Sequence, residues 1–157
     1  MAANAHLADL VLLVAAAVLF YAAVTDLKHH KIRNELILLL LVLFVLHLVL
    51  SGRWIDAGWN FGLAAVVFGF LLFFYSCQWM GGGDVKMLTV AFLWTGVQCA
   101  LAFAVLLFVF ASLHALSARF GWVASQGADD GGWRRIAFAP SVAAALIAVF
   151  ILGCVSP

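Results

Sequence analysis

The segment FGLAAVVFGFLLFFYSCQWM, residues 61–80, contains no acidic or basic side chain. A transmembrane helix needs roughly 20 consecutive apolar residues, so this segment predicts a membrane span. Backbone amides in lipid have no water to bind and must be satisfied within a helix. We therefore expect an all-α integral membrane protein with one domain over residues 1–157, a polytopic bundle of about six transmembrane helices with the fourth short. The other apolar runs are residues 7–24, 36–50, 85–94, 97–116 and 136–155.

The composition agrees with this class of protein. Of the 157 residues, 68% are apolar and 10% are charged, whereas a soluble domain averages about 45–50% apolar and about 25% charged. The mean hydropathy is +1.19. The formal net charge is only +1, so the chain lacks the basic excess that a nucleic-acid-binding surface requires. We expect contacts with membrane lipid and none with nucleic acid.

Charge placement decides one helix boundary. Residues 85–116 form either one tilted helix or two helices broken at Thr95-Gly96. Lys and Arg concentrate in cytoplasmic loops. With a break, only Arg53 lies opposite the other basic residues, which are Lys28, Lys31, Arg33, Lys86, Arg119, Arg134 and Arg135. Without a break, the basic residues divide evenly between the two sides. We therefore expect the break, with both termini outside and a cytoplasmic loop over residues 117–135.

Polar links are expected over residues 26–35 and 51–60, and a glycine turn over residues 81–83. Tryptophan prefers the membrane interface, and the tryptophans fall at or beyond the ends of the apolar runs: Trp54, Trp59, Trp79, Trp94, Trp122 and Trp133. The cysteines Cys77, Cys99 and Cys154 are too scattered to predict a disulfide framework or a zinc ribbon. We expect them to be ordinary buried residues.

Two carboxylates need an explanation in so apolar a chain. Asp26 ends the first run, where a carboxylate faces the negative end of the helix dipole. Its ordinary interpretation is an interfacial charge balanced by Lys28 and Lys31. Asp84 follows three glycines, and its ordinary interpretation is a helix N-cap. The glycines favour a second interpretation, because such a run suits close approach of the backbone by a ligand or peptide.

The two aspartates are more informative together. One crossing precedes Asp26 and three precede Asp84, so both are expected on the same side of the membrane. Two carboxyl groups about 3 Å apart share a proton, because both cannot ionise. The ionised group can take a proton from water while the other donates to a carbonyl oxygen. This arrangement is what aspartyl peptide-bond hydrolysis requires. No metal or other cofactor is expected, because no histidine pair has a ligand spacing beside a carboxylate or thiol.

Two other functions are compatible with the same residues. Membrane-embedded carboxylates commonly mark ion or proton pathways, and a broken 85–116 segment resembles the discontinuous helices of transporters. An ion- or proton-coupled transport component is therefore the alternative to a peptidase. An inactive structural partner in a larger assembly is a third interpretation.

The motifs resemble those of the type IV prepilin peptidase family. In that family an Asp is followed six residues later by Ile-Pro-Asn, and a helical hairpin further on by Gly-x-Gly-Asp-x-Lys. Here Asp26 precedes Ile32-Arg33-Asn34, with Arg33 in place of Pro, and residues 81–86 read GGGDVK. The inserted cytoplasmic domain with paired Cys-x-x-Cys motifs, associated with N-methylation, is absent. In this respect the chain is similar to the short branch that serves Flp, or tight-adherence, pili.

The resemblance implies a single transmembrane peptidase domain in the bacterial inner membrane, with its active site facing the cytoplasm. It implies prepilin or pseudopilin substrates, with Asp26 and Asp84 as the catalytic dyad. Gly81 and Gly83 would let the backbone approach the substrate, and Lys86 would tune or anchor Asp84. Asn34, retained from the first motif, is the remaining residue expected to support the active site.

Overall fold

The structure is a computed structural model that describes residues 2–29, 33–119 and 138–155. Within these residues the chain is helical without strands: α1 Ala2–His29, α2 Asn34–Ser51, α3 Trp54–Ser76, α4 Gly82–Arg119 and α5 Ala139–Ile151. The first four are long and apolar enough to cross a membrane, and α5 is a shorter apolar helix. The expected all-α polytopic membrane fold is confirmed.

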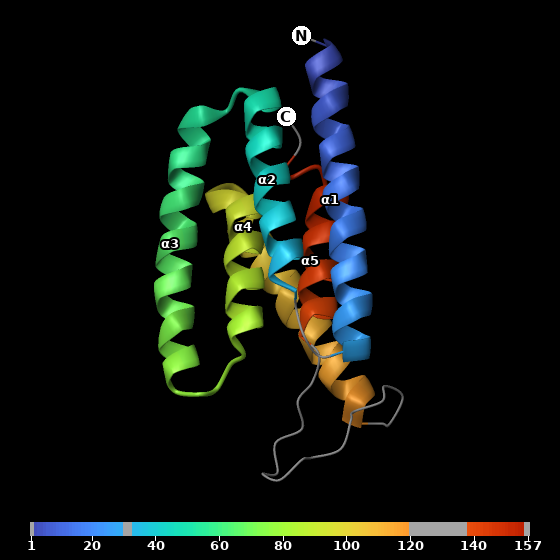
Figure 1. Ribbon diagram of the computed structural model, residues 1–157, viewed down its shortest axis with the longest axis vertical. Helices are drawn as coiled ribbons and strands as arrows, with labels where there is room; N and C mark the ends of the chain where they lie inside the picture. The colour runs from blue at the N-terminus through green and yellow to red at the C-terminus, as the bar shows by residue number, and fades with distance from the viewer. Residues whose placement is uncertain (1, 30–32, 120–137, 156–157) are drawn as a thin grey trace.

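Helix α4 is bent back on itself at Gly96, which has φ 60° and ψ −175°. The rings of Phe92 and Phe103, on either side of the bend, have centroids 5.0 Å apart, whereas a straight helix would separate these positions by about 16 Å. The predicted break is therefore confirmed. The first arm, residues 82–95, is about 21 Å long, shorter than a full span, as expected for the fourth segment. Counting both arms, the described residues form six helical segments, and each runs antiparallel to the one before it (Figure 1).

The bend is held by a side chain from the neighbouring helix. Oδ1 of Asn60, on α3, accepts a hydrogen bond from the main-chain N–H of Val97 at 3.4 Å. This N–H is one of those that a break leaves without a helical partner. A Cβ at Gly96 would overlap the Asn60 side chain, lying 2.6 Å from its Nδ2. The reversal therefore requires glycine both for its positive φ and for its lack of a side chain.

The core lies between the first arm of α4 and helices α1, α2 and α5. Trp94 is 2% exposed, and its Nε1 donates to the main-chain oxygen of Leu40 at 3.2 Å. Its ring also packs against Phe44 and Phe150. The prediction that Trp94 lies at an interface was wrong, because the short first arm ends inside the bundle. Three other tryptophans are exposed at helix ends, as expected, and two lie outside the described residues: Trp54, Trp59 and Trp79, then Trp122 and Trp133.

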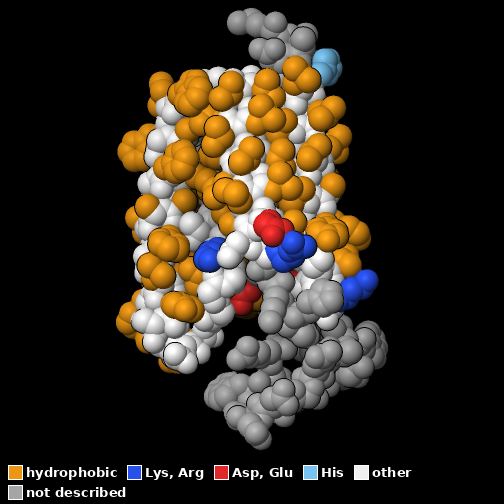
Figure 2. Space-filling view, viewed as in Figure 1, with side chains coloured by type: hydrophobic (Ala, Val, Ile, Leu, Met, Phe, Trp, Pro, Cys, Tyr) orange, Lys and Arg blue, Asp and Glu red, His pale blue; other side chains and the backbone are white. Residues whose placement is uncertain are grey.

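The sides of the bundle are apolar (Figure 2). Helix α3 shows this most clearly, because it buries only Ala57, Ala64 and Leu71, which recur every seven residues and make one narrow stripe. Its large side chains, such as Phe70 and Phe73, face outward. On the face that Figure 2 shows, the visible acidic and basic side chains lie toward one end of the molecule. The apolar sides are those expected of a protein that stands in lipid.

Two expected boundaries moved. Helix α3 begins at Trp54, inside the expected polar link 51–60. Asp56 lies in its first turn and accepts a hydrogen bond from Arg53 Nε at 2.8 Å, and an acidic residue is favoured there by the helix dipole. Helix α1 continues past Asp26 to His29, so the link before α2 is shorter than expected. Helix α4 ends at Arg119 and so extends into the expected loop 117–135. Residues 120–137 lie outside the described residues.

The cysteine prediction was also wrong. Cys99 and Cys154 form a disulfide across 55 residues of sequence, whereas Cys77 is free and exposed. The sequence spacing hid this pair because the bend at Gly96 brings the start of the second arm of α4 to the end of α5. A straight helix would have carried Cys99 elsewhere.

Candidate active site

Asp26 lies in the last turn of α1 and is 5% exposed. Its Oδ2 accepts a hydrogen bond from the main-chain N–H of Ala139 at 3.2 Å. Ala139 begins α5, and Phe138 before it makes no side-chain capping bond. Asp26 therefore caps α5 from another helix. The N-terminal end of a helix attracts negative charge, and this contact offsets the cost of burying a carboxylate.

Asp84 lies in the first turn of α4 and is half-buried. The main-chain N–H groups of Asp84 and Val85 donate to the carbonyl oxygen of Gly81 at 3.1 and 3.2 Å. Oδ2 of the Asp84 carboxyl group also lies beside Gly81, 3.2 Å from the place that a Cβ of that residue would occupy. The hydrogen bonds to Gly81 fix the backbone from which this carboxyl group projects. Asp84 therefore lies in the first turn of α4, next to the turn that joins α3 and α4.

The structure places both aspartates at the same end of the bundle. Asp26 stands where α1 ends and α5 begins, and Asp84 stands where α4 begins. Figure 1 shows these helix ends together, away from the end where α1 starts and α5 finishes. The charge of Asp26 acts on the carboxyl group of Asp84. Two acidic groups from helices distant in sequence therefore lie within electrostatic reach of each other.

A second contact joins the two motifs. Nζ of Lys86 donates to Oδ1 of Asn34 at 2.9 Å, and both side chains are exposed. Asn34 is the first residue of α2 and Lys86 lies in the first turns of α4, so this bond ties the starts of two helices together. The sequence had singled out both residues without indicating that they touch each other.

Arg33 stands where the motif that the sequence resembles has proline. Its backbone nevertheless has a proline-like φ at the entry to α2. Its φ is −73°, close to the value of about −65° that proline imposes. The Arg33 guanidinium pairs with Glu35 in the first turn. The backbone therefore reaches the conformation that proline would fix, and a surface ion pair accompanies it.

Two glycines at the start of α4 have little free space around them. A Cβ at Gly81 would lie 3.2 Å from Oδ2 of Asp84, and one at Gly82 would lie 3.3 Å from the ring of Tyr75. Both separations are tighter than ordinary van der Waals contact. Gly83 lies in the first turn of α4. The sequence had named Gly81 and Gly83, whereas the structure adds Gly82 and its neighbour Tyr75.

Sequence reasoning also missed the main-chain N–H of Ala139. A main-chain donor leaves no residue-type signal, although Pro140, at the start of α5, marks a helix start. As for metals, the described ranges hold no group of three or more His, Cys, Asp and Glu residues that could bind one. His29 and His30 follow Asp26 in the sequence. His30 and the side chain of His29 lie outside the part of the chain that the structure describes.

Comparison with known proteins adds one finding. A family model described as "Type IV leader peptidase family" matches residues 13–116. The match includes Asp26, Asn34 and the glycine-rich segment through Lys86. No curated protein and no solved structure matches the chain.

Proposed function

The chain belongs to the type IV leader peptidase family, and on this premise we propose that it is a membrane aspartyl endopeptidase. In this proposal it cleaves the leader peptide from Flp-type prepilins at the cytoplasmic face of the bacterial inner membrane. Asp26 and Asp84 activate the attacking water between them. The observation that carries the proposal is the placement of these two carboxyl groups, from α1 and α4, within electrostatic reach at one end of the bundle.

The proposed chemistry uses one ionised and one protonated carboxyl group. The ionised group takes a proton from water as the water oxygen attacks the scissile carbonyl carbon, and the protonated group donates to the carbonyl oxygen. Collapse of the tetrahedral intermediate breaks the C–N bond. The leaving amine takes up the proton gained from water, and one hydroxyl proton of the intermediate returns to the aspartate that donated to the carbonyl oxygen, which restores the dyad. No covalent enzyme intermediate forms.

The neighbouring contacts supply orientation. The N–H of Ala139 holds one oxygen of Asp26, and the main-chain hydrogen bonds to the carbonyl oxygen of Gly81 fix the start of α4 at Asp84. The Lys86–Asn34 bond keeps the starts of α4 and α2 in register beside the dyad. Positioned groups of this kind matter because misplacement of about 1 Å can cost about 10²-fold in rate.

The place of the site suits a prepilin. Such a substrate has a short basic leader followed by a long apolar helix, so its scissile bond lies where cytosol meets lipid. The two aspartates stand at one end of an apolar bundle, and this supports a site at that level. More of the described basic residues lie at the end with the two aspartates than at the opposite end, which has Arg53. Because Lys and Arg concentrate on the cytoplasmic side, this bias favours a cytoplasmic dyad. The residues at the dyad end are Lys28, Arg33, Lys86 and Arg119.

The Flp-type substrate is proposed from the similarity to the family branch without the inserted domain. The sequence given carries no paired Cys-x-x-Cys motif, which larger family members use in the domain associated with N-methylation. Peptidase activity is the activity that we propose for this chain. The partners in this proposal are a prepilin or pseudopilin and membrane lipid.

Cleavage of a Flp-type prepilin by the purified full-length chain in liposomes tests the proposal. The expected result is a size shift with the wild type that is lost in Asp26→Asn and in Asp84→Asn. Asp9→Asn is the matched control, because Asp9 is an exposed aspartate on the same helix as Asp26, and it should cleave normally. Full activity in either dyad variant contradicts the proposal. Ion flux that Asp84→Asn abolishes, with no cleavage by the wild type, would favour the transport alternative.

A further inference from the structure

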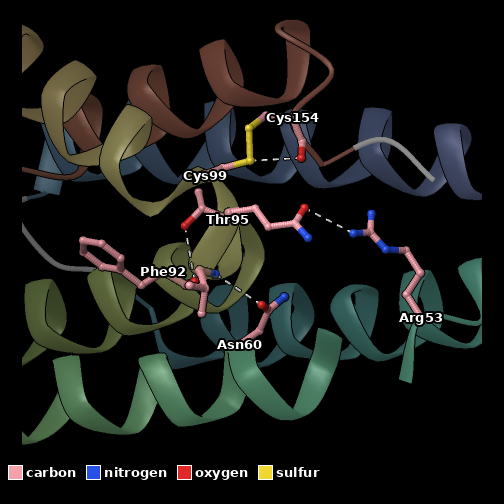
Figure 3. The surroundings of a disulfide bond; sticks show 8 residues. Arg53, Asn60, Phe92, Thr95, Cys99 and Cys154 are labelled. Carbon is pink, nitrogen blue, oxygen red and sulfur yellow. Dashed lines mark hydrogen bonds between the residues drawn. A yellow bond between two sulfur atoms is a disulfide. The ribbon is translucent and has the colours of Figure 1, made fainter. Parts of the chain in front are cut away.

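The three cysteines divide between the two ends of the bundle. Cys99 and Cys154 are joined by a disulfide beside the bend of α4 (Figure 3), at the end opposite the aspartates. Cys77 follows α3 at the dyad end and is exposed and unpaired. A disulfide persists in an oxidising compartment such as the periplasm, and thiols stay reduced in the cytosol. The division is the one expected if the two ends face these two compartments.

The two paired cysteines differ in exposure. Cys99 is 1% exposed, whereas Cys154 is half-buried and lines a small pocket. Arg53, Asp56 and Gln98 also line this pocket, whose volume is about 50 Å³, room for one or two water molecules. Cys99 is not among the residues that line it. Of the two residues, Cys154 is therefore the more accessible to a reagent that arrives from water.

The bond also has a mechanical position. Cys99 lies three residues beyond Gly96, in the first turn of the second arm of α4, and Cys154 lies just beyond the end of α5. Helix α5 supplies, at its other end, the N–H that holds Asp26. The disulfide thus fastens the bend of α4 to α5, the helix whose N-terminus is capped by Asp26.

We propose that Cys99–Cys154 is a redox modification site on the non-cytoplasmic side, oxidised by a dithiol–disulfide exchange protein through Cys154. The Cys154 thiolate attacks the donor's disulfide, forms a mixed disulfide and releases one donor thiolate. The Cys99 thiolate then attacks the Cys154 sulfur and releases the second donor thiolate. Two electrons pass to the donor, and two protons leave the protein cysteines. The oxidised bond locks the bend of α4 to α5. This proposal does not depend on peptidase activity.

Thiol counting on the full-length chain tests the pairing. The protein is purified without reductant, free thiols are blocked with N-ethylmaleimide, and the disulfide is then reduced and labelled with a maleimide-polyethylene glycol. We expect only Cys77 to be blocked in the first step, and Cys99 and Cys154 to take the label after reduction. Cys77→Ser is the matched control and should leave the two labels unchanged. Blocking of all three cysteines before reduction overturns the proposal.

Capture by glutathione disulfide tests the order of attack. In the Cys99→Ser variant Cys154 should form a mixed disulfide with glutathione, whereas in Cys154→Ser the buried Cys99 should react far more slowly. Faster capture at Cys99 contradicts the assignment of Cys154 as the attacking thiol. For the compartment, a membrane-impermeant maleimide added to intact spheroplasts should label Cys154 in Cys99→Ser and leave Cys77 unlabelled. Labelling of Cys77 but not Cys154 overturns the orientation.

Discussion

Replacing Gly96 by alanine should destabilise the protein by about 2–4 kcal/mol. A positive φ with ψ near 180° is a conformation essentially limited to glycine, and forcing it on alanine costs about 1–3 kcal/mol. The new methyl group would also overlap the Asn60 side chain. Moving that side chain away breaks its hydrogen bond to Val97, which contributes about 1 kcal/mol.

A double-mutant cycle separates these two causes. Asn60→Ala alone should cost about 1 kcal/mol, because it removes only the hydrogen bond. In the Gly96→Ala/Asn60→Ala variant the new methyl group no longer overlaps a side chain at position 60. The loss of the hydrogen bond between Asn60 and Val97 contributes only once to the destabilisation of this variant. The double variant should therefore be less destabilised than the sum of the single variants by about 1 kcal/mol.

The measurement is equilibrium unfolding of the purified protein in mixed micelles, titrated with SDS and followed by tryptophan fluorescence. Gly69→Ala is the matched control. A Cβ at Gly69, within helix α3, meets nothing within 4 Å, so alanine should be neutral or stabilising by up to about 1 kcal/mol. If Gly96→Ala is as stable as this control, or if the two single effects add fully, the account of the bend is wrong.

Three further predictions concern the start of α4 and the core. Lys86→Met should slow prepilin cleavage, because the tether to Asn34 is lost, and Asn34→Ala should slow it similarly. Both should leave thermal unfolding near that of the wild type, and an unfolding defect as large as the rate loss would refute a positioning role. Gly82→Ala should also reduce cleavage, because its Cβ presses on the ring of Tyr75, and Tyr75→Ala should restore part of the rate if crowding is the cause. Trp94→Phe should lower the free energy of unfolding in SDS by about 1 kcal/mol, because the buried hydrogen bond from Trp94 to α2 is lost. An unchanged unfolding free energy would contradict that contact.

Much of the fold could be predicted because lipid imposes simple rules. Long uncharged runs must be helices, and the distribution of Lys and Arg indicated a break near Gly96 without any structural knowledge. The same counting placed Asp26 and Asp84 at one end of the bundle, where the structure has them. Their catalytic role remains a proposal.

What could not be predicted depends on contacts between distant segments. The Cys99–Cys154 bond follows from the reversal at Gly96, and no spacing rule reports it. Trp94 is buried because the short first arm of α4 ends inside the bundle, although tryptophan generally favours interfaces. The start of α3 at Trp54 depends on the pairing of Arg53 with Asp56, which a hydropathy count treats as two unfavourable charges.

The reaction of the two aspartates as one unit is the central claim, and a kinetic cycle with prepilin tests it most directly. Asp26→Asn and Asp84→Asn should each lower kcat by at least about 10²-fold. The double variant should be no slower than the slower single variant, because either change alone already disables a shared function. Losses that multiply in the double variant, or a single variant that retains near wild-type kcat, would show that the two carboxyl groups do not act together.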